Sequence, residues 1–390
     1  MEKVFEKYFK GDKIIWAVII MLTIFSVLAV YSSTGTLAVA KQNGNTIYYI
    51  IKHVSILVVG LVIIYITHLI PYKYYSRLSQ LLLLVSIPLL IITLFIGTNL
   101  NEASRWITVP VIGLTFQTSD FAKLALVMYI ARQLSLKQNN IKDFNNAFLP
   151  IIVPVIIICM LIIPANFSTA AIVLLTSVIL MFIGRISFKH LSLFALTGIF
   201  AIAMFILIAL QVNKEGRIQT WKNRIENFRS GESEDNYQVE QAKIAIAKGG
   251  IVAFKPGKST QRNFLPHAYS DFIFAIIIEE YGLIGGAIII LLYLFLMFRA
   301  GVIVKKCSRT FPAFLAMGLT VMIVFQAFVN MAVAVNLIPV TGQTLPFISM
   351  GGTSLLFTSI ALGIILSVSR FSNKMVNPEI ITPEEDESEE

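Results

Sequence analysis

The sequence predicts an all-α polytopic membrane protein with about ten transmembrane helices. Three observations support this fold class. Of the 390 residues, 56% are hydrophobic and only 14% are charged, whereas soluble domains are about 25% charged. Apolar stretches of about 20 residues, the length that crosses a bilayer as a helix, recur along the chain. Basic residues gather in alternate connecting loops, as they do on the cytoplasmic side of membrane proteins.

Each predicted span is an apolar stretch bounded by polar, glycine-containing or proline-containing connections. The ten spans are predicted near residues 14–33, 48–70, 78–97, 120–136, 148–164, 169–184, 191–212, 271–298, 312–335 and 353–370. No stretch remains between them for a separate soluble domain. Residues 1–372 are therefore expected to form one ten-helix transmembrane domain.

The loops between these spans differ in charge. Those on the side of the amino terminus contain most of the lysines and arginines, whereas the short loops on the other side contain Lys41, Lys52 and Arg105. Because positively charged loops stay in the cytoplasm, both termini are predicted to be cytoplasmic. The long loop 213–270, between spans seven and eight, is then extracytoplasmic. Residues 373–390 are mostly acidic and are expected to be a disordered cytoplasmic tail.

Several kinds of site are excluded by the side chains. Cys159 and Cys307, the two cysteines, lie in an apolar run and in a basic loop, so no disulfide framework or zinc cluster is expected. Residues 256–260 resemble the end of a phosphate-binding P-loop. That pattern, however, requires glycine where Val252 stands, and no buried strand precedes it. Neither a nucleotide nor a nucleic acid is expected as a partner.

Asp271 is the main candidate for a functional residue. It follows a polar segment and opens the apolar run of span eight, at the predicted outer boundary of the membrane. An aspartate in this place can cap the helix by accepting backbone amide hydrogens. A carboxylate beside an apolar wall also has a raised affinity for protons, which suits a general base. The two roles are compatible, and the sequence leaves both open.

Two further groups of polar side chains lie at the outer ends of spans. Trp106 occupies the outer loop after span three, where it is either an interfacial anchor or, together with the guanidinium of Arg105, part of a site for a diphosphate head group. Asp120 and Lys123 lie three residues apart at the start of span four. Charged residues at membrane depth are candidates for functional sites.

Glu279 and Glu280 lie further along span eight. Glu279 is about 12 Å deeper than Asp271 and about 80° round the helix, which is too deep to share a substrate with it. Glu280 points to the side opposite Asp271. We predict that these carboxylates either pair with a basic side chain or couple the helix to a neighbouring helix or a partner protein.

The last outer loop, residues 336–354, contains prolines and glycines that exclude a continuous helix, among them Pro339, Gly342 and Pro346. Irregular backbone at membrane depth is tolerated only where it packs within protein or lines a wet cavity. The amides of residues 351–354 open span ten and can receive an anion. This loop is therefore expected to contribute to a binding site.

These segments together resemble a known family. The sequence is similar, from span one to span ten, to the shape, elongation, division and sporulation (SEDS) proteins. The resemblance is carried by Arg105-Trp106, by Pro266 with the segment 271–275, and by the segments 117–123, 279–282 and 339–354.

This resemblance implies a peptidoglycan glycosyltransferase. Its substrate would be lipid II, the undecaprenyl-diphosphate disaccharide-pentapeptide, polymerised at the outer face of the cytoplasmic membrane. The family's essential aspartate corresponds to Asp271, which would take the proton from the acceptor sugar's 4-hydroxyl. Arg105, Lys123, Arg262 or a divalent cation such as Mg²⁺ or Mn²⁺ would stabilise the leaving diphosphate. No other cofactor is implied.

The resemblance also assigns roles to the other residues. Those implied to bind substrate are Arg105, Trp106, Gln117, Lys123, Arg262, His267, Thr341, Ser349, Gly351 and Ser354. Those with a structural or partner-coupling role are Asp120, Glu279, Glu280, Pro339, Gly342 and Pro346. Residues 265–267 and 270–272 are more similar to the division member of the family than to the elongation member. This implies the inner membrane at the division septum as the location, and a class B penicillin-binding transpeptidase and other division proteins as partners.

Two other functions remain open from the residues. A lipid II flippase would use the same polar cavity, but it needs a polar path to the cytoplasmic half, and spans five, six, seven and nine have no charges at mid-depth. A scaffold of the division site would use Asp271 only as a helix cap. Asparagine at position 271 separates these functions from catalysis, because it preserves a cap but is not a base.

Overall fold

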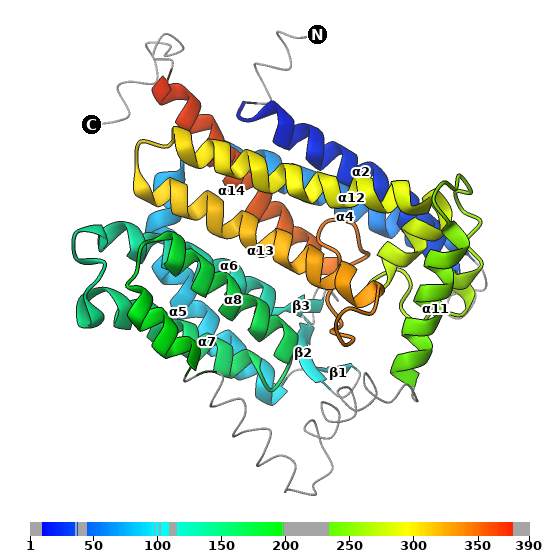
Figure 1. Cartoon of the computed structure of the whole chain (residues 1–390), viewed down its shortest axis with the longest axis horizontal. Helices are drawn as coiled ribbons and strands as arrows, with labels where there is room; N and C mark the ends of the chain where they lie inside the picture. Colours follow the sequence, from blue (N-terminus) through cyan, green and yellow to red (C-terminus); the bar gives the residue numbers. More distant parts are fainter. Residues whose placement is uncertain are drawn as a thin grey trace, which may run out of the picture.

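The structure is a computed structural model that describes residues 10–35, 37, 45–96, 98–100, 103–108, 115–196, 198 and 234–376. Its main helices are α2 (Lys13–Ser33), α4 (Thr46–Leu69), α5 (Tyr72–Ile96), α6 (Thr118–Leu136), α7 (Leu149–Ile162), α8 (Phe167–Ile183), α11 (Glu234–Gly249), α12 (Ile273–Lys306), α13 (Thr310–Ala334) and α14 (Gly352–Val376) (Figure 1). Short helices η1 (Gln138–Asn140), η2 (Phe144–Phe148) and η3 (Gln261–Asn263) join them.

The helical membrane architecture predicted from the sequence is confirmed. Within the described ranges, seven helices are long and apolar enough to cross a membrane, and α8 is a shorter apolar helix. The helix α6 has 19 residues and contains the buried charges of Asp120 and Lys123. Most of predicted span seven, 191–212, lies outside the described residues, as do residues 213–233 of the long loop and residues 377–390 of the tail.

Two helices form the centre of the molecule. The apolar stretches of α13 and α14 are 67% buried, against 22% for α4. The helix α13 packs against α6, α8, α12 and α14, and α14 packs along α4. In Figure 1, α12 lies along one side of α13, with α2 beyond it, while α5 to α8 lie on the other side. Polar side chains on α13 can therefore reach several neighbouring elements.

The prediction of an all-α fold is wrong for the connection between α5 and α6. Strands β1 (Thr98–Leu100), β2 (Ala103–Thr108) and β3 (Thr115–Gln117) form an antiparallel sheet in the order β1-β2-β3. The three short strands pair their backbone groups with one another, which satisfies them beside the apolar helices. Threonine and isoleucine favour strands, but segments this short do not show the alternation that predicts one.

The helix α12 is longer than its predicted span, 271–298, and it is broken. Gly282 has φ 70° and ψ −176°, which no helix contains. A Cβ atom at this position would lie 2.6 Å from the backbone oxygen of Ile251 and 2.7 Å from the nitrogen of Ala253. The break lets the backbone of the preceding loop bind to the helix, since Leu283 donates to Gly250 O at 3.0 Å.

One other boundary predicted from the sequence is also corrected. The helix α14 ends at Val376, past the expected end of the membrane domain at residue 372, so the first residues of the predicted tail continue the helix. In the long loop 213–270, the amphipathic spacing of residues 237–247 indicates a short helix. The helix α11 lies at this position and packs on α12.

We expect Gly282→Ala to lower the free energy of unfolding. The combination of positive φ and extended ψ, which is essentially restricted to glycine, costs a residue with a Cβ about 1–3 kcal/mol, and the contacts with Ile251 and Ala253 add to this cost. The measurement is denaturant unfolding of the purified protein in detergent micelles. Gly301→Ala in the same helix is the control. A Cβ at Gly301 meets nothing within 4 Å, and alanine favours helix by up to about 1 kcal/mol. Equal stability of the two variants would contradict the role given to Gly282.

Candidate functional site

The backbone around Asp271 is held by the loop that precedes α14. Three consecutive carbonyl oxygens accept hydrogen bonds: that of Tyr269 from the amide of Met350 at 2.9 Å, that of Ser270 from Ser349 Oγ at 2.5 Å, and that of Asp271 from Asn330 Nδ2 at 2.8 Å. The helix α12 begins at Ile273 with Phe272 as its N-cap, so Asp271, for which the sequence leaves both a cap and a base open, lies one residue before the cap position. Its position depends instead on this set of bonds.

Two amide side chains of α13 connect the site, and they were not singled out in the sequence. Asn330 donates to Gln343 O at 2.7 Å in addition to Asp271 O. Gln326 donates to Thr344 O at 3.1 Å and accepts from Lys123 Nζ at 3.0 Å. Their spacing of four residues places both on one face of the helix. Two amides so spaced in an apolar span are the sequence signal that would have identified them.

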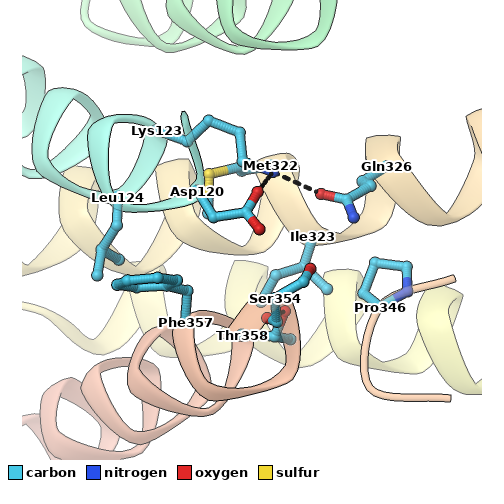
Figure 2. A pocket seen from close by; sticks show the side chains of 10 residues that line it. All are labelled: Asp120, Lys123, Leu124, Met322, Ile323, Gln326, Pro346, Ser354, Phe357 and Thr358. Atoms are coloured by element: carbon cyan, nitrogen blue, oxygen red, sulfur yellow. Dashed lines mark hydrogen bonds and ion pairs between the residues drawn. The ribbon is translucent and has the colours of Figure 1, made fainter. Parts of the chain in front are cut away.

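Asp120 and Lys123 form a buried ion pair beside a cavity. Lys123 Nζ lies 2.8 Å from Asp120 Oδ1, with both side chains at most 6% exposed. The cavity is small and partly open to the surroundings, with room for about one or two water molecules. Figure 2 shows the pair and Gln326 on one side of it, with Pro346 and Ser354 on the other. The structure therefore brings together four predicted site residues: Asp120, Lys123, Pro346 and Ser354.

The sheet places two other predicted residues next to α14. Trp106 in β2 pairs with Gln117 in β3, and both are half-buried. The amide of Gln117 donates to Thr353 Oγ1 at 3.3 Å, and its side chain donates to Ser119 Oγ at 3.0 Å. Arg105 lies in β2 next to Trp106, but its side chain lies outside the described part of the chain, so its predicted role stays a prediction.

Glu279 and Glu280 bind the loop that leads to Asp271. Glu279 accepts hydrogen bonds from the Ser259 hydroxyl and from the amides of Thr260 and Gln261, at 3.0 and 3.2 Å. Glu280 accepts from the amide of Ser259 at 3.0 Å and from the Ser32 hydroxyl of α2. Glu280 thus contacts the neighbouring helix α2, while the predicted coupling role of the two glutamates stays a prediction. Pairing of either carboxylate with a basic side chain is not seen among the described residues, because backbone amides take that place.

Arg262 lies in η3, and His267 lies in the segment between η3 and α12. Arg262 Nη1 donates to Ser32 O at 2.9 Å and to Gly257 O at 3.1 Å, so this guanidinium helps to fix the loop on α2. His267 is exposed, has φ 55°, and lies 3.4 Å from the Tyr269 hydroxyl through Nδ1. Burial raises the pKa of Tyr269, and the nearby Asp271 carboxylate raises it further.

The loop before α14 supplies the remaining predicted residues. Gly342 has φ 65°, a conformation that glycine adopts without strain, and Pro339 and Thr341 precede it in irregular backbone. Ser349 accepts from the amide of Leu345 at 2.8 Å while it donates to Ser270 O. Gly351 precedes α14. The expected lack of a continuous helix in this loop is confirmed, and its backbone packs within protein as predicted.

Lys123→Met is expected to destabilise the protein by about 3–5 kcal/mol, because it leaves the Asp120 carboxylate buried without its cation. The double variant Lys123→Met with Asp120→Leu should recover most of this loss, since both charges are then gone. The measurement is the free energy of unfolding in detergent. Lys142→Met serves as the control. It removes an exposed charge and should change stability by less than about 0.5 kcal/mol. A double variant no more stable than the single one would refute the pairing.

The chain is similar to curated and solved proteins over most of its length. Residues 12–374 match the sequence model of the cell cycle proteins FtsW, RodA and SpoVE. The probable peptidoglycan glycosyltransferase FtsW of Trichlorobacter lovleyi is 34% identical over 364 residues, which cover 92% of this chain and 93% of that protein. The predicted family resemblance is thereby confirmed.

Two solved structures share the fold. A chain from a structure on the coordination of polymerization and crosslinking by a peptidoglycan synthase complex has a TM-score of 0.69 at 23% identity, covering 92% of this chain and 98% of that chain. The rod shape determining protein RodA of Thermus thermophilus has a TM-score of 0.64 at 24% identity, covering 92% and 97%. The fold and the sequence match agree: this chain belongs to the FtsW, RodA and SpoVE family of cell cycle proteins.

Proposed function

We propose that this protein is a peptidoglycan glycosyltransferase that polymerises lipid II at the outer face of the cytoplasmic membrane during cell division. Membership of the family and the name of the relative from T. lovleyi support this activity. We assign the active site to Asp271 because three hydrogen bonds hold the backbone carbonyls of residues 269–271. These bonds hold one carboxylate at the start of a long apolar helix.

Asp271 is the general base of the proposed reaction. Its carboxylate takes the proton from the 4-hydroxyl of the acceptor sugar as that oxygen attacks the anomeric carbon of the donor. The new glycosidic bond forms while the bond from the anomeric carbon to the diphosphate breaks, and undecaprenyl diphosphate leaves with the electron pair. General-base catalysis of this kind contributes about 10²–10⁴-fold to a rate. No nucleotide is consumed, because the lipid diphosphate is the activated donor.

Charge that develops on the leaving diphosphate needs cations. We assign this role to Arg105, Lys123 and Arg262, of which Lys123 lies on a cavity with Ser354. A divalent cation would add further charge. Among the described residues, no group of three or more histidine, cysteine, aspartate or glutamate side chains can hold a metal ion.

The remaining predicted residues form the rest of the substrate site in this proposal. Gln117 and Trp106 pair across the sheet. Ser349 and Gly351 precede α14, next to the hydrogen bonds that hold residues 269–271. His267 lies in the loop before α12 and Thr341 in the loop before α14, and these hydrogen bonds join the two loops. An elongated lipid head group contacts several loops at once, which fits this distribution.

The proposed orientation places both termini in the cytoplasm and the loop 213–270 outside. It is supported by the ion pair between Asp12 and Arg299, which brings the start of α2 and the basic end of α12 to the same side of the membrane. The amino terminus and Lys305-Lys306 then share the positive side. Ten spans within residues 1–372 and a cytoplasmic acidic tail, from the end of α14 to residue 390, complete this topology.

A class B penicillin-binding transpeptidase and other division proteins are the proposed partners, and the division septum of the inner membrane is the proposed location. The structural neighbour from a synthase complex that couples polymerization with crosslinking supports such a partner. The similarity to relatives named FtsW supports the division role.

Asp271→Asn is expected to lower the initial rate of glycan-strand formation by at least about 100-fold, because the amide cannot take a proton. The measurement uses purified lipid II and the detergent-solubilised protein with its cognate transpeptidase. Asp143→Asn is the matched control. This carboxylate is exposed in the loop before η2, and its loss should leave the rate unchanged.

Each outcome of this experiment has a distinct meaning. Equal rates for wild type and Asp271→Asn would keep the enzyme and remove Asp271 as its base. No polymer from the wild type with the transpeptidase bound would favour the flippase or the scaffold. Thermal unfolding of each variant shows whether a loss of rate reflects a loss of fold.

A further inference from the structure

Three apolar side chains protrude together beside the break in α12. Ile251, Val252 and Phe254 are 72%, 73% and 82% exposed, although the loop that carries them is firmly attached. We call residues 250–258 the kink loop. The amide of Ile284 donates to Ile251 O at 3.3 Å, and the amide of Lys255 donates to Glu280 O at 2.9 Å. The three exposed side chains are therefore held at a fixed position along α12.

Two contacts between α2 and α12 indicate the depth of the kink loop relative to the membrane. Asp12, the N-cap of α2, forms an ion pair with Arg299, and Ser32, near the other end of α2, donates to Glu280. At 1.5 Å per residue the two contacts are about 30 Å apart along either helix. The hydrocarbon core of a bilayer is about 30 Å thick. If the charged pair marks one boundary, Glu280 and the kink loop lie at the other.

Tyrosine side chains mark the same level. Tyr31 of α2 is 54% exposed and borders the kink loop, since a Cβ atom at Gly257 would lie 3.3 Å from its ring. The ring of Tyr281 lies 6.3 Å from that of Phe254 in an edge-to-face arrangement. Tyrosine is enriched where a membrane meets water. The kink loop is thus surrounded by residues typical of the interface.

The exposed charges of the kink loop are positive. Lys255 and Lys258 are exposed. The two nearby acids, Glu279 and Glu280, are buried and accept hydrogen bonds from the amides of Ser259 and Thr260, which follow the kink loop. Apolar side chains next to lysines favour the surface of anionic lipids, where the former enter the acyl boundary and the latter bind phosphate groups. If only water surrounded the kink loop, the apolar side chains of Ile251, Val252 and Phe254 would stay in contact with water, which is unfavourable.

We propose that the kink loop is a membrane anchor, in which Ile251, Val252 and Phe254 insert into the outer interface and Lys255 and Lys258 bind anionic phospholipid head groups. The anchor does not depend on the glycosyltransferase activity. It fixes the height of the loop 259–261, which Glu279 and Glu280 attach to α12, relative to the lipid surface.

A fluorescent label at Phe254→Cys tests the insertion. Cys159 and Cys307 are replaced by alanine, and the full chain is labelled with an environment-sensitive dye and reconstituted in phosphatidylcholine–phosphatidylglycerol vesicles. Lipids with a nitroxide near the head group should quench the dye more than those with a nitroxide at the acyl end, because insertion is about 5–10 Å deep. Leu84→Cys on α5 should show the reverse order, and Lys142→Cys should show little quenching.

The lipid preference tests the two lysines. At position 254, nitroxide-labelled phosphatidylglycerol should associate more strongly than the phosphatidylcholine analogue, by about fivefold per lysine. Lys255→Gln with Lys258→Gln should abolish this difference without moving the label out of the bilayer. The label at Leu84 should show no preference, and the unfolding temperature of each variant is checked first.

Two results would overturn the proposal. If the label at position 254 is quenched as little as that at position 142, the kink loop stands clear of the bilayer. If quenching is present in the chain alone but lost when the cognate transpeptidase binds, the surface is a docking site for that protein and not a lipid anchor.

Discussion

Irregular backbone packed between apolar helices has to find its hydrogen-bond partners within the protein, and this requirement shapes the whole site. An unsatisfied amide or carbonyl in such surroundings costs several kcal/mol. The amides of Asn330 and Gln326 on the central helix α13 meet the requirement for the loop before α14. Asn330 also bonds to the segment before α12. One helix face therefore fixes two loops relative to each other.

The same requirement explains the loop that resembles a P-loop. Its amides at Ser259, Thr260 and Gln261 converge as phosphate-binding amides do, but they receive carboxylates of the same chain, Glu279 and Glu280. An internal anion thus occupies the place that a nucleotide phosphate would take.

The membrane helices and the family could be predicted from the sequence because apolar length and ordered motifs are local signals. The sheet could not, since strands of three to six residues depend on pairing partners rather than on their own pattern. The break at Gly282 could not be predicted either, because a glycine within an apolar run also occurs in intact helices, as Gly301 shows. The positive φ of Gly282 and the approach of Ile251 and Ala253 distinguish the two positions, and these depend on the folded structure.

The candidate site was predicted more completely for charged residues than for neutral ones. Asp120, Lys123 and Asp271 were singled out because charge is rare at membrane depth. Asn330 and Gln326 were overlooked, although they connect these residues, because an uncharged amide changes the hydropathy of a span only slightly. Arg262 was expected to bind substrate, and its contacts with Ser32 and Gly257 show a second use of its guanidinium.

The hydrogen bonds that hold residues 269–271 all end on backbone carbonyls of that segment. Every amino acid carries such a carbonyl, so the location of position 271 does not depend on which side chains stand at 269, 270 or 271. Evolution can therefore vary the side chains at positions 269 and 270 while the scaffold that places Asp271 stays unchanged.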